Sequence, residues 1–145
     1  MPIFIADDLG PGPAGHCKLR RRLARLLREL GRGGASLTVL LTDDEAMREL
    51  NRTHRSKDKS TNVLSFPDTD LALGQRDYLG DVALSLPYVE REAAERGLEA
   101  SWLFYFYLVH GLLHLMGHDH ELGREAYDAQ DAETARLLAL IRTDW

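Results

Sequence analysis

The sequence HGLLHLMGHDH, residues 110–120, places three histidines in the pattern H-x-x-x-H-x-x-x-x-x-H. His110 and His114 are four residues apart, so a helix presents them on one face, about one turn apart. On an unbroken helix His120 would lie roughly 15 Å from His110. Gly117 supplies the permissive backbone that a turn requires. We therefore predict that the helix breaks after His114, so that three imidazoles converge on one metal ion with an open fourth position.

A different interpretation applies if only the first two histidines are considered. A lone histidine pair on an apolar helix is more often buried and hydrogen-bonded than it is a set of metal ligands. The third histidine and the turn glycine favour the metal site. His118 is next but one to His120 and is expected to point elsewhere. Three imidazole ligands favour zinc, although nickel, iron and copper also accept them.

Gly111 separates this motif from a protease signature with the same histidine spacing. Metzincin proteases carry H-E-x-x-H-x-x-G-x-x-H, in which the glutamate is the general base. Glycine stands at the glutamate position here and cannot take a proton. The motif therefore predicts the metal site and disfavours ordinary metzincin proteolysis.

Length and composition indicate one cytoplasmic domain over residues 1–145. The chain is 44% hydrophobic and 28% charged, an ordinary globular balance. Cys17 is the only cysteine, which excludes an internal disulfide and suits a reducing compartment. No secretory leader is expected, because residues 1–5 run straight into acidic positions. The apolar run 102–116 is too short for a bilayer and predicts a buried helix.

Charge is segregated along the chain, although the net charge of −5 does not by itself advertise a nucleic-acid partner. The basic side of such a chain can still bind phosphate backbones. For the first of two basic blocks, a merely solvated helix face is an equal alternative. The first block consists of Lys18, Arg20, Arg21, Arg22, Arg25, Arg28 and Arg32, and the second of Arg52, Arg55, Lys57 and Lys59. The acidic side chains of the C-terminal stretch are Glu121, Glu125, Asp128, Asp131 and Glu133.

Hydrophobic periodicity and breaker residues predict the order of elements. We expect Ser101 to cap the histidine-bearing helix and residues 52–62 and 68–77 to be loops. The element order is typical of an α+β domain with a small mixed sheet covered by helices. The predicted strands are residues 3–5, 37–41, 63–66 and 79–86, and the other predicted helices are residues 18–30, 43–51, 87–97 and 124–141.

Three segments together resemble the YbeY family of bacterial rRNA-maturation endoribonucleases. They are HGLLHLMGHDH at 110–120, LNRTHRSKD at 50–58 followed by TNVLSFP at 61–67, and the pair Gly80-Asp81. The resemblance covers residues 50–120, and the N-terminal third matches only in general layout. His54, Ser60 and His118 stand where tyrosine, proline and tyrosine are common, which affects the loop shape and substrate contacts but not the metal site.

The resemblance implies a single zincin-like domain with its metal site on a central buried helix. It implies one zinc ion on His110, His114 and His120, and hydrolysis of single-stranded RNA. It also implies a role in small-subunit rRNA 3′-end processing and late ribosome quality control. The expected partners are rRNA and the small ribosomal subunit, with no DNA and no membrane.

Other residues are candidates for roles around that metal. Arg55 lies in the matched segment, where a guanidinium can stabilise charge that develops on a phosphodiester; the alternative is a salt bridge with Asp58 or Asp81. Asp119 is the second catalytic candidate, because it can hold a histidine N–H or accept a proton; a turn cap is the alternative. Asp81 is a candidate for a similar supporting role, although its spacing favours a plain turn at the start of a strand. The candidates for binding the RNA backbone are Arg52, Lys57 and Lys59.

Two further functions remain compatible with the sequence. One is a metal-dependent hydrolase of peptides or small substrates. The other is a non-catalytic ribosome-associated factor with structural zinc, which a fourth ligand from Cys17 or His118 would favour. For the nuclease, the sequence is compatible with either water or the RNA 2′-hydroxyl as nucleophile.

Overall fold

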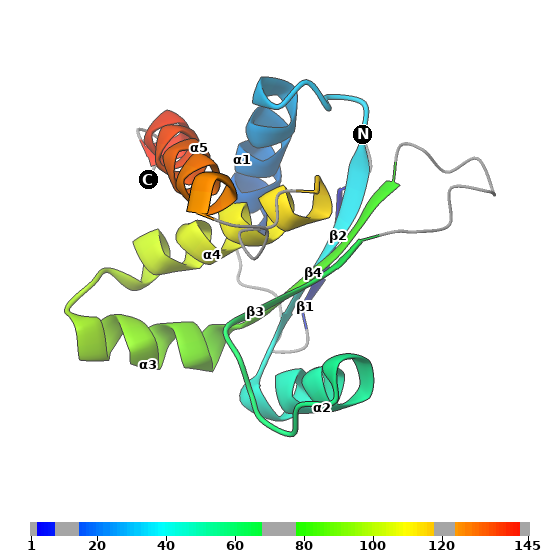
Figure 1. Cartoon of the computed structure of the whole chain (residues 1–145), viewed down its shortest axis with the longest axis vertical. Coiled ribbons are helices and arrows are strands. Elements are labelled where there is room, and N and C mark those ends of the chain that lie inside the picture. Colours follow the sequence, from blue (N-terminus) through cyan, green and yellow to red (C-terminus); the bar gives the residue numbers. More distant parts are fainter. Residues whose placement is uncertain (1–2, 8–14, 68–77, 118–123, 143–145) are drawn as a thin grey trace.

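The computed structural model describes residues 3–7, 15–67, 78–117 and 124–142 (Figure 1). In these ranges no helix combines the length and apolar character that crossing a membrane requires. The predicted loop 68–77 lies outside the described residues. The strands are β1 (Ile3–Asp7), β2 (Ser36–Thr42), β3 (Val63–Pro67) and β4 (Tyr78–Ser85). The helices are α1 (Gly15–Glu29), α2 (Asp44–Arg55), α3 (Leu86–Arg96), α4 (Ala100–Leu115) and α5 (Arg124–Arg142).

The four described strands form one mixed sheet in the order β1-β2-β4-β3. β1 and β2 pair in parallel, with Ile5 opposite Val39, and β2 and β4 pair in parallel, with Val39 opposite Val82. β3 runs antiparallel to β4, with Ser65 opposite Val82. The prediction of an α+β fold with a small mixed sheet is therefore confirmed.

The larger hydrophobic core lies on the face of the sheet that α1, α4 and α5 cover (Figure 1). Side chains alternate between the two faces of a strand, so every second residue of β2 enters this core. The α1 leucines recur at helical spacing, as the sequence predicts, and α4 contributes apolar residues on several sides because it is buried. The core members include Leu37, Val39 and Leu41 from β2, Leu19, Leu23, Leu26 and Leu27 from α1, and Leu108, Val109, Leu112 and Leu113 from α4.

The opposite face of the sheet is covered by α2 and carries a much smaller core (Figure 1). Met47 of α2 packs there with Leu64 of β3 and Ala83 of β4. Leu40, Leu50 and Phe66 are half-buried around this cluster. Few apolar side chains therefore hold α2 against the sheet.

Two predicted boundaries were wrong. Residues 52–55 are helical, because α2 continues to Arg55 and ends where Ser56 adopts the left-handed conformation, with φ of 58°. A serine rarely takes that conformation, so no glycine marked the end of the helix. Ser101 does not cap α4, because the helix starts at Ala100 and the extended residue at its N-cap is Glu99.

Candidate metal centre

His110 and His114 lie together near the C-terminal end of α4. Their ring centroids are 5.4 Å apart, with 42° between the ring planes, and both side chains are half-buried. Phe106, one turn earlier, stacks on His110 with a centroid distance of 6.5 Å. The prediction that a helix presents this pair on one face is therefore confirmed.

Gly111 lets α4 approach the sheet closely beside this pair. A Cβ atom built at Gly111 would lie 2.8 Å from Cγ1 of Val82 and 3.2 Å from Cγ2 of Val63. The Ser65 hydroxyl of β3 donates a hydrogen bond of 3.0 Å to the Gly111 carbonyl. A glutamate, as metzincins carry here, would force the side chains of Val82 and Val63 to move, so packing explains the glycine.

The helix ends directly after the second histidine, as the glycine turn predicts. Leu115 is the last residue of α4, and Gly117 has φ of 92°. The Gly117 N–H donates to the His114 carbonyl at 3.1 Å. His118, Asp119 and His120 lie outside the described residues, so the third predicted ligand and the second catalytic candidate stay predictions.

The two described imidazoles fit a shared cation. Two imidazoles on one tetrahedral zinc, with Zn–N distances of about 2.1 Å, have ring centroids roughly 5 Å apart. The observed separation of 5.4 Å agrees with this. Within residues 3–7, 15–67, 78–117 and 124–142, no group of three or more His, Cys, Asp or Glu could hold a metal. A complete ligand set at this position therefore requires a donor such as His120.

Gln130 of α5 contacts the histidine pair, and sequence reasoning missed it. Its amide nitrogen Nε2 lies 2.9 Å from His110 Nδ1, and the side chain is only 3% exposed. One signal was present in the sequence, because Gln130 falls on the helical stripe of α5 that continues with Thr134, Leu137 and Ile141, all buried. A polar residue on such a stripe requires a hydrogen-bonding partner.

The basic segment, residues 52–59, leads from α2 toward β3, the strand whose Ser65 is hydrogen-bonded to α4. The backbone at Lys57 and Lys59 is fixed by Asn51, which is buried. The Asn51 carbonyl accepts from the Lys57 N–H at 3.2 Å, and its side-chain amide donates to the Lys59 carbonyl at 2.9 Å. The side chains of Arg55, Lys57 and Lys59 are exposed. A fixed backbone with exposed cations suits contact with a polyanion.

The residues that follow this segment are tied to the rest of the fold by Asp44, in the first turn of α2. Its Oδ1 accepts from Ser60 at 3.1 Å and from Ser85 at 2.9 Å, and its Oδ2 pairs with Arg91 at 2.6 Å. The Arg91 hydrogen bond is the main reason that the pKa of Asp44 lies below its ordinary value, and the serine hydroxyls add to it against the effect of burial. Asp44 thus joins α2, β4 and α3 at one carboxylate.

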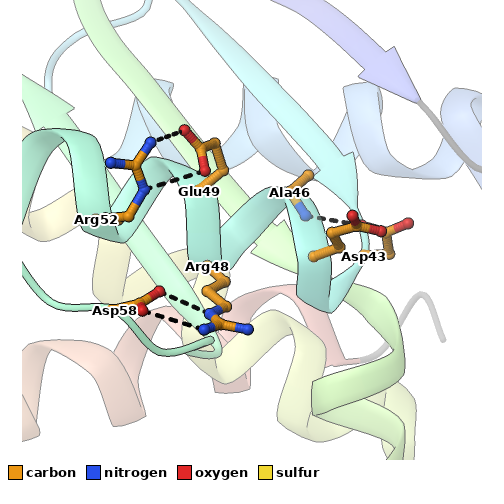
Figure 2. Close-up of a pocket in the computed structure, with 7 residues that line it drawn as sticks. Asp43, Ala46, Arg48, Glu49, Arg52 and Asp58 are labelled. Carbon is orange, nitrogen blue, oxygen red and sulfur yellow. Dashed lines mark hydrogen bonds and ion pairs between the residues drawn. The ribbon is translucent and has the colours of Figure 1, made fainter.

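Arg52 and Arg55 differ in their surroundings. Figure 2 shows Arg52 reaching Glu49, and Arg48 reaching Asp58, in an exposed groove of about 670 Å³. Arg48 Nε donates to Asp58 at 2.7 Å, which keeps the pKa of Asp58 below its ordinary value. The groove lining is Asp43, Glu45, Ala46, Arg48, Glu49, Arg52 and Asp58. Its two arginines are paired with carboxylates, and the four carboxylates of the lining outnumber them, so the groove carries a net negative formal charge.

Neither acidic partner proposed for Arg55 is paired with it. Asp58 pairs with Arg48, and the exposed Asp81, inside β4, accepts from the Tyr78 hydroxyl. Among the described residues, the Arg55 side chain has no hydrogen-bond or ion-pair partner. The alternative in which Arg55 forms a salt bridge with Asp58 or Asp81 is therefore not supported.

Of the remaining sequence candidates, the α4 aromatics and Arg22 pack in the fold, whereas Cys17 does not. Tyr105 of α4 is buried, and Phe104, Phe106 and Tyr107 pack half-buried against the core, as expected for consecutive aromatics on a buried helix. Arg22 of α1 is buried under the Tyr105 ring at 4.8 Å, so the first basic block is not wholly a solvated face. Cys17 is exposed on α1.

Comparison with known proteins identifies the class to which this fold and histidine pair belong. A family model described as Endoribonuclease YbeY matches residues 18–140. The chain belongs to the YbeY family. The family resemblance seen in residues 50–120 is thereby confirmed and extended to α1 and α5.

Individual relatives give the same family. Endoribonuclease YbeY of Rhodopseudomonas palustris is 46% identical over 111 residues, covering 74% of this chain and 58% of that protein. Endoribonuclease YbeY of Stutzerimonas stutzeri is 43% identical over 138 residues, covering 93% and 84%. Endoribonuclease YbeY of Myxococcus xanthus is 50% identical over 100 residues, covering 68% and 34%. The chain thus spans about a third to four fifths of the length of these relatives.

A solved structure supports the fold over nearly the whole chain. The solution structure of TM1509 from Thermotoga maritima is 25% identical to this chain and superposes with a TM-score of 0.66. The match covers 99% of this chain and 93% of that one.

Proposed function

We propose that this chain is a single-strand-specific, metal-dependent endoribonuclease that acts in rRNA maturation. Membership of the YbeY family supports the reaction class, since the relatives named above are endoribonucleases by name. The observation that carries the proposal is the His110–His114 pair at 5.4 Å, directly before the turn at Gly117. We propose that residues 1–145 form one zincin-like domain around this pair.

The proposed cofactor is one zinc ion on His110, His114 and His120. A neutral imidazole donor set leaves the charge of the cation intact, so the ion would supply a Lewis acid beside the scissile phosphodiester. The packing of Gly111 against β3 and β4 keeps a carboxylate general base out of the position that peptidases use. This favours phosphodiester cleavage over peptide hydrolysis.

The proposed role of the basic segment is to bind the RNA and to stabilise charge on its phosphoryl group. We propose that Arg55 stabilises negative charge on the phosphoryl oxygens; in support, no described carboxylate neutralises its guanidinium. Lys57 and Lys59 are proposed to contact the RNA backbone. They lie in a loop whose own main chain is fixed by Asn51. We propose that Arg52 also binds an RNA phosphate, which would replace Glu49 as its ion-pair partner. Asp119 is proposed as a second catalytic residue.

The proposed biological setting follows from the family. We propose that the protein acts in the bacterial cytoplasm on small-subunit rRNA 3′ ends and in late ribosome quality control. The net charge of −5 favours a partner, the small ribosomal subunit, that helps to hold the RNA.

One assay tests this function against its rivals. Purified protein is incubated with unstructured RNA, structured RNA and casein, each with and without a chelator. The proposal expects cutting of the unstructured RNA that the chelator abolishes and zinc restores. Cleavage of casein but not RNA would make the protein a peptidase. Inertness toward all three substrates, with zinc bound, would make the metal structural.

A further inference from the structure

Gln130 occupies a position that the proposed reaction does not yet explain. It comes from α5, twenty residues beyond His110, and its side chain is 3% exposed. Its amide contacts His110 Nδ1 at 2.9 Å. A buried glutamine whose side-chain contact is a histidine ring nitrogen constrains that ring.

The other end of the same amide is incompletely satisfied. Gln130 Oε1 is buried, and no described residue gives it a hydrogen bond. A buried acceptor without a donor costs free energy, about 1–3 kcal/mol. The oxygen and nitrogen of a carboxamide have nearly the same shape, so a half-turn of the amide exchanges them within the same space.

The two amide orientations have opposite consequences for His110. If Nε2 of Gln130 donates to Nδ1 of His110, the imidazole proton lies on Nε2 of His110. If Oε1 of Gln130 accepts instead, the proton lies on Nδ1 and the lone pair is on Nε2 of the ring. The second orientation gives the buried Oε1 its donor. It also presents a ring nitrogen that can bind a cation.

We propose that Gln130 is a positioning residue for His110: Oε1 accepts the Nδ1–H, so that Nε2 of His110 is the ligand nitrogen. The inference rests on the proposed metal function. Ligand histidines in metal sites commonly donate their other N–H to a carboxylate or carbonyl oxygen, which fixes the tautomer and the ring orientation. Phe106, stacked on the same ring, restricts its tilt. α5 thereby shapes a site whose described histidines both lie on α4.

Zinc affinity of purified protein, measured by competition with a chromophoric chelator, tests the role. Gln130→Met keeps the length and removes the acceptor, and should weaken zinc binding about 10- to 100-fold. Gln130→Glu keeps an oxygen acceptor and should retain the wild-type affinity or exceed it. Thr134→Val is the matched control, because Thr134 is equally buried and its hydroxyl donates to the Gln130 backbone carbonyl at 2.8 Å. It should leave zinc affinity unchanged.

A second measurement does not depend on zinc. The ¹⁵N chemical shifts of the His110 ring in metal-free wild-type protein report which nitrogen carries the proton. A proton on Nδ1 supports the proposal, and a proton on Nε2 overturns it. Wild-type affinity in Gln130→Met would also overturn it. If the wild-type protein bound no zinc, the metal function would fail, while the tautomer would still decide the role of Gln130. Should Gln130→Met not fold, Gln130→Glu and the wild-type spectrum still decide.

Discussion

At the scale of single residues, Gly111 has the clearest physical explanation. Its missing side chain lets α4 rest against β3 and β4, with Val82 and Val63 where a Cβ atom would lie. The same contact packs the helix that carries His110 and His114 against the sheet. A position that looks permissive in the sequence is thus a packing requirement.

Gly111→Ala should destabilise the fold by about 1–3 kcal/mol, because the added methyl group overpacks the helix–sheet contact. Urea unfolding measures this as a lower midpoint with the same slope. Gly34→Ala is the control, since a Cβ atom there meets nothing within 4 Å. An unchanged midpoint in Gly111→Ala would contradict the packing explanation of this glycine.

Arg55→Ala should lower the turnover of unstructured RNA about 10²- to 10³-fold, because charge on the phosphoryl oxygens loses its guanidinium. Zinc content should stay at the wild-type level, since Arg55 lies on α2 and not among the histidines. Arg55→Lys should recover part of the rate, because it restores the charge without the bidentate geometry. Normal cleavage by Arg55→Ala would remove this residue from the mechanism.

At the scale of elements, Asp44 connects α2 to β4, α3 and the residues before β3. Its lowered pKa means that this connection is pH-dependent. A depressed carboxyl pKa contributes stability that is present above its unfolded pKa of about 4 and is lost as the pH falls through the folded value. The contribution is modest, about 1 kcal/mol, because the side chains of Asp44 and Arg91 are 35% and 55% exposed.

Asp44→Asn should therefore be less stable than the wild-type protein at pH 7, and the difference should shrink as the pH falls from about 4 through the lowered pKa of Asp44. Urea midpoints measured at several pH values across this range give the curve. Glu45→Gln, one residue on in the same helical turn and exposed, should show no such dependence. A constant difference at all pH values would mean that Asp44 acts through its shape and not its charge.

Element prediction from this sequence succeeded where a periodic pattern was strong and failed at ends without a standard signal. The leucines of α1 predicted a helix and its buried face. The end of α2 was placed at Asn51, because Ser56 rather than glycine takes the left-handed conformation there. Ser101 was taken as a cap one residue inside the helix, because a cap depends on backbone angles that Glu99 adopts.

The candidate site was predictable only in its local part. His110 and His114 are brought together by one helix, so their spacing was enough. Gln130 reaches His110 through the packing of α5 on α4, and no spacing rule connects them. Likewise, the partner of Asp58 is Arg48, ten residues earlier on α2, and no spacing rule predicts that contact.

At the scale of the whole molecule, charge is divided among two basic blocks, one on α1 and one at residues 52–59, and an acidic C-terminal stretch. If Lys57 and Lys59 bind RNA phosphates, Lys57→Gln with Lys59→Gln should reduce the salt dependence of RNA binding. The slope of log affinity against log salt should fall by roughly 1 to 1.5, at about 0.7 for each phosphate that the variant no longer neutralises. Binding is measured with chelator present, so that the RNA stays intact.

The matched control is Lys18→Gln with Arg20→Gln, which removes the same charge from exposed positions on α1. This pair should leave the slope unchanged. Equal effects of the two double variants would show that the RNA responds to net charge rather than to the basic segment.

The unequal cores on the two sides of the sheet have a consequence for motion. α2 is held by a cluster built around three buried side chains, Met47, Leu64 and Ala83, whereas α4 lies in the large core. Local opening costs least where little apolar surface is uncovered. Amide protons of α2 should therefore exchange with deuterium well before those of α4. The protein would keep α4, which carries the histidines, rigid while α2, which carries Arg55, opens locally. Bound RNA would slow the amide exchange of α2.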